Sequence, residues 1–126
     1  VAGFLAGGVE AWRASGRALA SIPQITVADL RSMVGRDGLQ VVDVRRAGEY
    51  RGGHVPGAVH APLDRIADEA GRLDPERPTA VICAGGYRSS AAASLLAARG
   101  FRDLRNVLGG TGAWVDAGYE VERPLT

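Results

Sequence analysis

A short apolar segment, Thr79–Ile82, ends at Cys83, the only cysteine in the chain, and a glycine-containing turn and an alanine- and leucine-rich segment follow. An apolar run of this length bounded by a turn is typical of a strand buried in a sheet, and the longer segment after it is typical of a helix. The sequence therefore predicts a strand–loop–helix unit that carries the thiol where the strand ends. Backbone N–H groups of a tight loop and a helix start favour an anion at such a position.

The same alternation of short apolar runs and helical segments extends along the chain. Strands are expected at residues 39–44, 58–60, 79–83 and 104–107, with an edge strand at 25–26, and helices at residues 26–34, 63–72 and 89–99. Thr26 and Asp29 have the spacing of a capping box at the first helix. The pattern predicts an α/β fold with a central, mainly parallel five-stranded sheet and helices on both faces. Asp43 and Cys83 would then lie at one edge, at the carboxyl ends of their strands.

The loop after Cys83 has the residue types that stabilise a thiolate, which is the reactive form of cysteine. Glycines let the backbone curl so that several amides point inward, and Arg88 adds a fixed positive charge. The residues expected to form this cradle are Ala84, Gly85, Gly86, Tyr87, Arg88 and Ser89. The alternative is that Cys83 is only a small buried hydrophobic residue, as free cysteines often are.

Residues 83–90, Cys-Ala-Gly-Gly-Tyr-Arg-Ser-Ser, resemble the active-site loop of the rhodanese family. Four residues separate Cys83 from Arg88, which resembles the sulfurtransferases, whereas the related cell-cycle phosphatases have a loop longer by one residue. Three other segments resemble the family in the same order: Val-Val-Asp-Val-Arg at 41–45, Glu-Tyr-Arg-Gly-Gly-His-Val-Pro-Gly-Ala at 49–58 and Asn-Val-Leu-Gly-Gly-Thr-Gly-Ala-Trp at 106–114. The resemblance covers about residues 25–122 and implies a rhodanese-like fold.

The resemblance implies a thiosulfate:cyanide-like sulfurtransferase in which Cys83 carries a persulfide. A small-molecule sulfur donor, such as thiosulfate or a low-molecular-weight persulfide, would load the cysteine, and a thiol or cyanide would accept the sulfur. Amides of residues 84–88 would stabilise the terminal sulfur, Arg88 would attract an anionic donor, and no cofactor is needed. Two alternatives remain open. One is a regulatory or docking module of a larger protein, for example a fusion to a metallo-β-lactamase-type hydrolase. The other, disfavoured by loop length, is a phosphatase or arsenate reductase.

Several polar residues outside the loop are candidates for supporting roles. Asp43 and Arg45 could form an acid–base pair, but a hydrogen-bonded brace for neighbouring loops is the favoured interpretation. Glu49 is expected to be a structural partner, and His54 is expected to shape a turn rather than to carry a proton. His60 has no second histidine or cysteine at metal-ligand spacing, so no metal site is expected.

The N-terminal residues repeat a motif from the end of the chain. Gly7, Gly8, Ala11, Trp12 and Gly16 recur as Gly109, Gly110, Ala113, Trp114 and Gly118, each 102 positions later. A repeat at that distance indicates two similar domains. We therefore expect residues 1–20 to be the C-terminal remnant of a preceding rhodanese-like domain, 21–24 a linker and 25–126 the rhodanese-like domain. The apolar face around Trp12 would need cover, either by docking on the main domain or in a homodimer.

Charge and cysteine content limit the remaining function classes. The net charge is +1 and the charges are interspersed, so neither a nucleic acid nor a membrane surface is expected as a partner. No apolar run reaches the length of a membrane span, and the first residues lack the basic region, apolar stretch and cleavage site of a signal peptide. A single cysteine that cycles as a thiol suits a reducing compartment, which predicts the cytoplasm.

Overall fold

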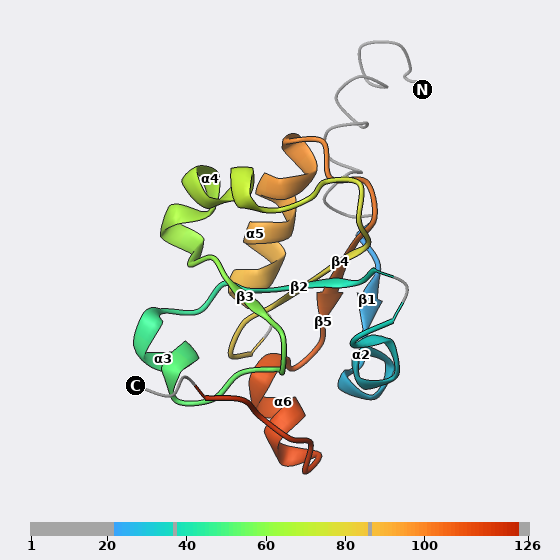
Figure 1. The fold of residues 1–126 in the computed structure, drawn as a ribbon, viewed down its shortest axis with the longest axis vertical. Helices are drawn as coiled ribbons and strands as arrows, with labels where there is room; N and C mark the ends of the chain where they lie inside the picture. The colour runs from blue at the N-terminus through green and yellow to red at the C-terminus, as the bar shows by residue number, and fades with distance from the viewer. Residues whose placement is uncertain (1–21, 37, 86, 124–126) are drawn as a thin grey trace.

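A computed structural model of the chain describes residues 22–36, 38–85 and 87–123, and a five-stranded sheet forms its centre (Figure 1). The strands are β1 (Gln24–Ile25), β2 (Gln40–Asp43), β3 (Val59–His60), β4 (Thr79–Ile82) and β5 (Leu104–Val107), in the spatial order β1-β5-β4-β2-β3. All four pairings are parallel. The sheet therefore confirms the predicted architecture. In the β2–β4 register Asp43 lies opposite Ile82, so Asp43 and Cys83 end at the same edge.

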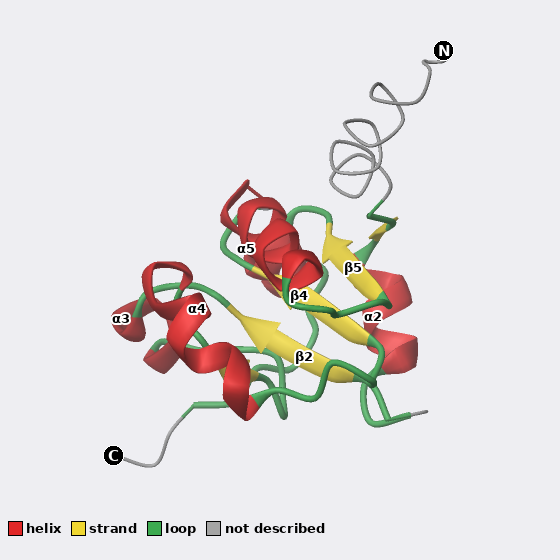
Figure 2. Ribbon diagram, turned by 90° about the horizontal axis from the view of Figure 1, so that it is seen from above, coloured by secondary structure: helices red, strands yellow, loops and turns green. Residues whose placement is uncertain are grey.

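Helices cover both faces of this sheet. They are α2 (Val27–Met33), α3 (Ala47–Arg51), α4 (Ile66–Glu69), α5 (Tyr87–Ala98) and α6 (Gly110–Asp116). In Figure 2 the strands run between α5 on one side and α2 on the other. The predicted capping box at the start of α2 is confirmed, because the Asp29 N–H donates to Thr26 Oγ1 and the Thr26 N–H donates to the Asp29 carboxylate.

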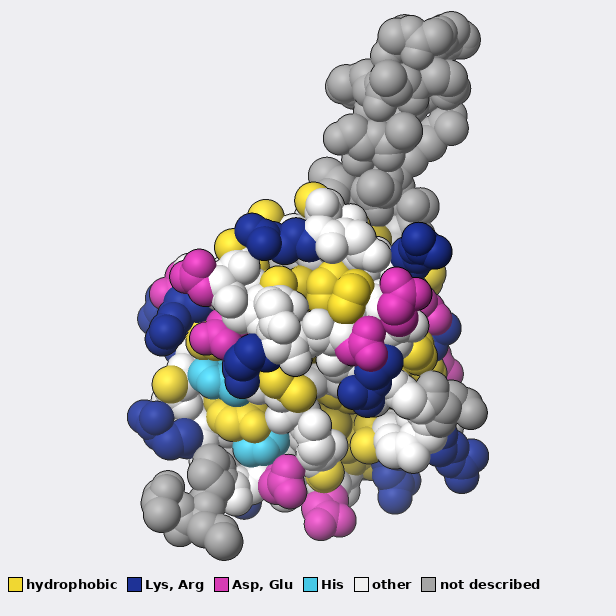
Figure 3. Space-filling view, turned by 45° about the horizontal axis from the view of Figure 1, so that its top comes forward, with side chains coloured by type: hydrophobic (Ala, Val, Ile, Leu, Met, Phe, Trp, Pro, Cys, Tyr) yellow, Lys and Arg dark blue, Asp and Glu magenta, His cyan; other side chains and the backbone are white. Residues whose placement is uncertain are grey.

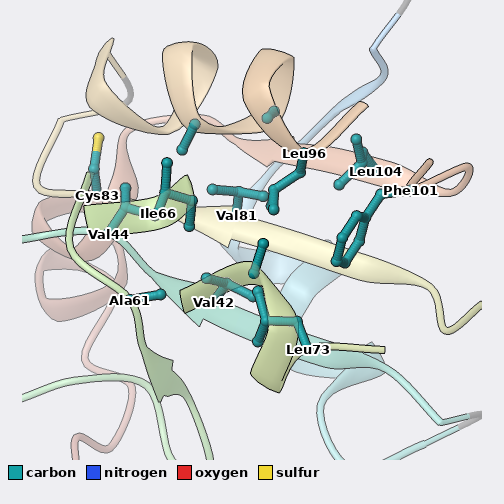
Figure 4. Close-up of a cluster of buried hydrophobic side chains, with 13 residues drawn as sticks. Val42, Val44, Ala61, Ile66, Leu73, Val81, Cys83, Leu96, Phe101 and Leu104 are labelled. Carbon is teal, nitrogen blue, oxygen red and sulfur yellow. The ribbon is translucent and has the colours of Figure 1, made fainter. Parts of the chain in front are cut away.

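The hydrophobic core has two layers because alternate residues of a strand point to opposite faces. Val42, Val81 and Cys83 belong to the layer beneath α4 and α5, which Figure 4 shows with Cys83 at one end. Val41, Ala80 and Ile82 belong to the layer beneath α2 and α6. The central strands β2 and β4 are buried along their whole length, which explains the consecutive apolar residues within them, Val41-Val42 and Ala80-Val81-Ile82.

The segment predicted as one helix over residues 63–72 is instead three short pieces. A 3₁₀ segment, Leu63–Arg65, precedes α4, and a second, Ala70–Arg72, follows it. Leu63, Ile66 and Ala70 of this segment, and Leu73 directly after it, contact the layer beneath α5, whereas Ala67 is exposed. Their spacing is three, four and three residues, and a spacing of three matches the 3₁₀ repeat. Packing of the segment against the core at these positions favours alternating 3₁₀ and α-helical turns.

Most other element boundaries differ from the expectation by one or two residues, for example α5, which begins at Tyr87 instead of Ser89. The edge strand begins at Gln24, which was expected to belong to the linker, and Thr26 caps α2 rather than ending the strand. The five-residue helix α3 was not predicted, because its sequence is polar, contains Gly48 and buries none of its residues. The expected domain remnant, residues 1–20, lies outside the described residues. Within the part of the chain that the structure describes, no helix is long and apolar enough to cross a membrane.

Candidate active site

Cys83 lies immediately after β4 and close to the start of α5, as the sequence predicts. Its side chain is 1% exposed and packs at the end of the apolar layer in Figure 4. Ala84 and Gly85 form a bend between the strand and α5, and Gly85 is exposed. The described part of the cradle therefore consists of Ala84, Gly85, Arg88, Ser89 and the backbone of Tyr87. Gly86 and the side chain of Tyr87 lie outside the described part.

A buried polar chain leads from the Cys83 sulfur into the sheet. The thiol contacts Ser89 Oγ at 3.5 Å, and the Ser89 hydroxyl donates to Asn106 Oδ1 of β5. A hydroxyl both donates and accepts, so Ser89 can rotate and donate to the sulfur when the thiol is ionised. Asn106 can then donate to Ser89 once its side-chain amide turns to present Nδ2 in place of Oδ1. Asn106 is thus a supporting residue that the sequence analysis missed.

The N-terminus of α6 holds the backbone of the Cys83 loop from the opposite side. The Thr111 N–H donates to the Cys83 carbonyl at 2.7 Å, and the Gly112 N–H donates to the Ala84 carbonyl at 3.1 Å. Gly110 has φ +58°, and a Cβ added there would lie 2.1 Å from the Cys83 carbonyl oxygen. The Gly109-Gly110 motif therefore permits a close approach that fixes the loop beneath the cysteine.

The Thr111 hydroxyl differs from most buried polar groups, which are hydrogen-bonded. Within the described residues its buried Oγ1 has no hydrogen-bond partner, whereas the buried Thr79 hydroxyl accepts from Gln40 and donates to the Arg77 carbonyl. Thr111→Val is therefore expected to leave the free energy of unfolding unchanged or to raise it. The matched variant Thr79→Val should lower it by about 1–3 kcal/mol, because Gln40 and Arg77 lose a partner. Urea unfolding of both variants tests this, and equal losses would contradict it.

Arg88 is held by Glu49 of α3 rather than pointing freely into solvent. Its Nη1 and Nη2 donate to the two carboxylate oxygens of Glu49 at 2.8 and 2.9 Å, and the Arg46 N–H donates to the same carboxylate at 3.0 Å. The hydrogen bonds from Arg88 lower the pKa of Glu49 to about 2, and the same pair raises the pKa of Arg88. The expected structural partner role of Glu49 thus has a specific geometry, a bridge from α3 to the Cys83 loop.

The Glu49–Arg88 pair should give a pH-dependent stability difference between the wild type and Glu49→Gln. Because the pKa of Glu49 falls from 4.5 to about 2 on folding, the ionised carboxylate stabilises the fold above pH 4.5. That contribution declines as the pH falls through this window and is lost below the folded pKa. Both side chains are about one-third exposed, so we expect about 0.5–1 kcal/mol at pH 7.

Urea unfolding of both proteins between pH 7 and pH 3 measures this difference. Glutamine keeps an oxygen that can accept from the Arg46 N–H, so the comparison isolates the charge. A difference that stayed constant or grew toward low pH would contradict the assignment.

Asp43 and Arg45 pair with each other at the end of β2. The Arg45 guanidinium donates to both Asp43 oxygens, with Nη2–Oδ2 at 2.8 Å, and the same Nη2 donates to the Gly53 carbonyl at 2.8 Å. Asp43 is fully buried and Arg45 is 6% exposed. This geometry connects the strand end to the loop after α3, which is what a brace requires. These contacts join the pair to the loop after α3, and a role of Asp43 and Arg45 in proton transfer stays a prediction.

His54 belongs to an aromatic stack that ties the C-terminal segment to the loop after α3. Its ring lies 3.7 Å from the ring of Tyr50, which in turn lies 4.4 Å from the ring of His60. Figure 3 shows both histidines on one face with hydrophobic surface between them. His54 Nδ1 is 2.9 Å from the Tyr50 carbonyl, and its backbone pairs with Glu122 in both directions. These contacts give His54 a structural role in the fold.

No three histidine, cysteine or carboxylate side chains in the described ranges gather as metal ligands. The site consists instead of one buried thiol, a loop of backbone amides, and two arginine–carboxylate pairs around them. A nucleophilic sulfur held in this way can attack a small electrophile and carry a transferred group covalently.

Comparisons with known proteins agree with this geometry. The family model described as Rhodanese-like domain matches residues 26–117. The thiosulfate sulfurtransferase GlpE of Shewanella oneidensis is 32% identical over 99 residues, which are 79% of this chain and 98% of that protein. The protein of Bacillus subtilis named "Putative sulfur carrier protein YrkF" is 36% identical over 95 residues, 75% of this chain, and the chain spans about half, 51%, of that relative.

A solved structure supports the fold independently. The crystal structure of a rhodanese-related protein from Thermoplasma volcanium superposes with a TM-score of 0.74 at 30% identity. The superposition covers 81% of this chain and 99% of the other. The predicted five-stranded α/β fold with helices on both faces is therefore confirmed by both the topology and the structural likeness.

Proposed function

This chain belongs to the rhodanese-like domain family, and from that premise we propose that Cys83 carries a sulfane sulfur from a small-molecule donor to a thiophilic acceptor. The family-level activity, rhodanese-type sulfur transfer, is supported by several relatives named thiosulfate sulfurtransferase at 32–38% identity. The observation that carries the proposal is the position of the single thiol at the end of β4, in contact with Ser89 at the start of α5.

In the first half-reaction the Cys83 thiolate attacks the outer sulfur of thiosulfate. A sulfur–sulfur bond forms to Cys83, the outer sulfur's bond to the sulfonate breaks, and the electron pair leaves with sulfite. Cys83 is then a persulfide with a negative terminal sulfur. Backbone amides of the loop favour that charge because they are fixed before the reaction, and the Ser89 hydroxyl favours it after rotating from Asn106 toward the sulfur.

Arg88 is proposed to attract the anionic donor, although two of its nitrogens already donate hydrogen bonds to Glu49. Arg46 and Arg88 both line a small cavity of about 310 Å³ beside the loop. Asp64 also lines this cavity, so its lining residues carry one net positive charge, which favours a small anion such as thiosulfate. In this arrangement Glu49 orients the Arg88 guanidinium and offsets part of its positive charge, and the donor is held by the remaining N–H groups.

In the second half-reaction an acceptor nucleophile removes the outer sulfur. Cyanide attacks that sulfur, the bond to Cys83 breaks, and its electron pair restores the thiolate as thiocyanate departs. A thiol reacts in the same way, and its proton ends on the product persulfide. Both half-reactions conserve atoms and charge, and neither needs an oxidant or a cofactor.

Intact mass of the purified chain after incubation with thiosulfate tests the proposal. We expect a mass gain of one sulfur atom that cyanide removes, with thiocyanate released in equal amount. Reduced, alkylatable Cys83 that gains no sulfur would contradict it. A single loading and unloading without repeated turnover would instead favour a sulfur relay, a second candidate that the relative named as a sulfur carrier supports.

We also infer that residues 1–20 end a preceding copy of this domain and that the protein works in the cytoplasm. In the described copy Gly109 and Gly110 bring α6 against the Cys83 loop, and Trp114 is 3% exposed in the core. The N-terminal motif with Gly7, Gly8 and Trp12 has the same spacing. The coding sequence upstream of Val1 tests the inference. A second strand–loop–helix pattern there would support it, and an unrelated sequence would contradict it.

A further inference from the structure

A second, larger cavity of about 560 Å³ opens on the other side of the Glu49–Arg88 bridge. Glu49 lines this cavity, whereas Arg88 lines the smaller one, so the bridge lies between them. The larger cavity reaches Ala84, the residue directly after Cys83. Its volume is within the range of sites that bind organic molecules of drug size, and it is far larger than thiosulfate or cyanide needs.

One wall of the cavity is apolar and held in place by the core. Val115 is 53% exposed, and Val115, Tyr119 and Val121 all line this cavity. The Tyr119 ring packs edge-on against the buried Trp114 at 5.0 Å, and the Arg31 guanidinium lies 4.8 Å from the ring centre. The wall therefore offers a fixed apolar surface for the carbon skeleton of a ligand.

Two side chains of opposite charge, Asp116 and Arg123, line the same cavity. Asp116 and Arg123 are exposed lining residues, and within the described ranges neither makes an ion pair. The Arg123 Nε donates to the Gly52 carbonyl at 3.0 Å, which orients the guanidinium and leaves its terminal nitrogens available. The other charged lining residues, Arg45 and Glu49, are already paired with Asp43 and Arg88. The free charges suit a ligand with both a carboxylate and an ammonium group.

We propose that this cavity binds the organic acceptor of the sulfur, a peptide-sized thiol with a carboxylate held by Arg123 and an ammonium group held by Asp116. The inference rests on the proposed function, because the thiol takes its sulfur from the Cys83 persulfide. The thiolate attacks the outer sulfur at the Ala84 end of the cavity, the bond to Cys83 breaks, and the electron pair restores the Cys83 thiolate. The carbon skeleton lies along Val115 and Tyr119.

Acceptor kinetics with charged probe thiols test the site. With thiosulfate as donor, 3-mercaptopropionate supplies only a carboxylate, cysteamine only an ammonium group, and glutathione supplies both. The Arg123→Gln variant should lower kcat/KM about threefold for 3-mercaptopropionate and glutathione relative to cyanide, and not for cysteamine. The Asp116→Asn variant should lower kcat/KM relative to cyanide about threefold for cysteamine and glutathione, and not for 3-mercaptopropionate. Arg102→Gln removes the charge of an exposed arginine at the opposite edge of the sheet. This control should leave kcat/KM relative to cyanide unchanged for all three thiols.

The outcomes separate this inference from the proposed function. If wild-type Cys83 gains no sulfur from thiosulfate, the proposed function and the acceptor site both fail. If Cys83 loads and cyanide unloads it, but the two charge variants handle all three thiols alike, only the acceptor site is overturned. Wild-type preference for glutathione over 2-mercaptoethanol, together with the crossed charge effects, supports the site.

Discussion

Replacing Cys83 with serine is expected to reduce sulfur transfer by at least about 10⁴-fold while leaving the domain folded. A serine hydroxyl is not ionised near neutral pH, and its oxygen cannot carry a sulfane sulfur as a stable sulfur–sulfur bond. The side chain is 1% exposed at the edge of the apolar layer, and the smaller oxygen fits the same space beside Ser89. The expected loss in the free energy of unfolding is therefore only about 1 kcal/mol.

Thiocyanate formation, intact mass and urea unfolding of the variant measure these two effects separately. Ser94→Ala is a suitable control, because Ser94 lies on α5 two turns beyond the Cys83 loop and its hydroxyl donates to the Ser90 carbonyl of its own helix. That variant should transfer sulfur as the wild type does. Thiocyanate formation by the serine variant within tenfold of the wild type would remove Cys83 from the reaction, and loss of the unfolding transition would show that Cys83 matters for folding.

The sheet and the position of the thiol could be predicted because their signals are local. A parallel strand buried on both faces reads as a continuous apolar run, as in β2 and β4, and the turn after β4 follows directly in the sequence. Cys83 and Asp43 share an edge for a topological reason, namely that parallel strands present their carboxyl ends together. These features needed no knowledge of side-chain contacts.

The partners around the thiol could not be predicted because they come from distant elements. Glu49 and Arg88 are 39 positions apart, and Ser89 and Asn106 are 17 positions apart. Asn106 lies within the strand β5, where the surrounding residues indicate only a buried strand. Glu49 lies on α3, whose short polar sequence has no helical periodicity. Only the folded chain brings these side chains to the loop.

The glycine motif at α6 connects the fold to the site, and Gly110→Ala is expected to damage both. The new Cβ would lie 2.1 Å from the Cys83 carbonyl oxygen and 2.7 Å from the Ala84 carbonyl oxygen, and neither backbone atom can move without shifting the loop. The positive φ of +58° adds the cost of a left-handed conformation. Together we expect a loss of about 3–5 kcal/mol in the free energy of unfolding.

Two other glycines of the same segment separate the effect of the Cβ clash from the effect of the positive φ. Gly118 has φ +82° with no atom within 4 Å of an added Cβ, so Gly118→Ala should cost only about 1–2 kcal/mol. Gly112 has no positive φ, and its added Cβ would lie 3.3 Å from the Ala84 carbonyl oxygen. Gly112→Ala should therefore keep most of the stability and slow the loading of Cys83 by thiosulfate through a small shift of the loop.

Urea unfolding of the three variants, with the rate of sulfur loading from thiosulfate, measures this series. Gly110→Ala should lose the most stability and load most slowly, and Gly118→Ala should load at the wild-type rate because its position is open. If Gly110→Ala proves too unstable to purify, the comparison of Gly112→Ala with Gly118→Ala still tests the contact. Equal stability losses at Gly110 and Gly118, or equal loading rates at Gly112 and Gly118, would mean that α6 does not fix the loop beneath the cysteine.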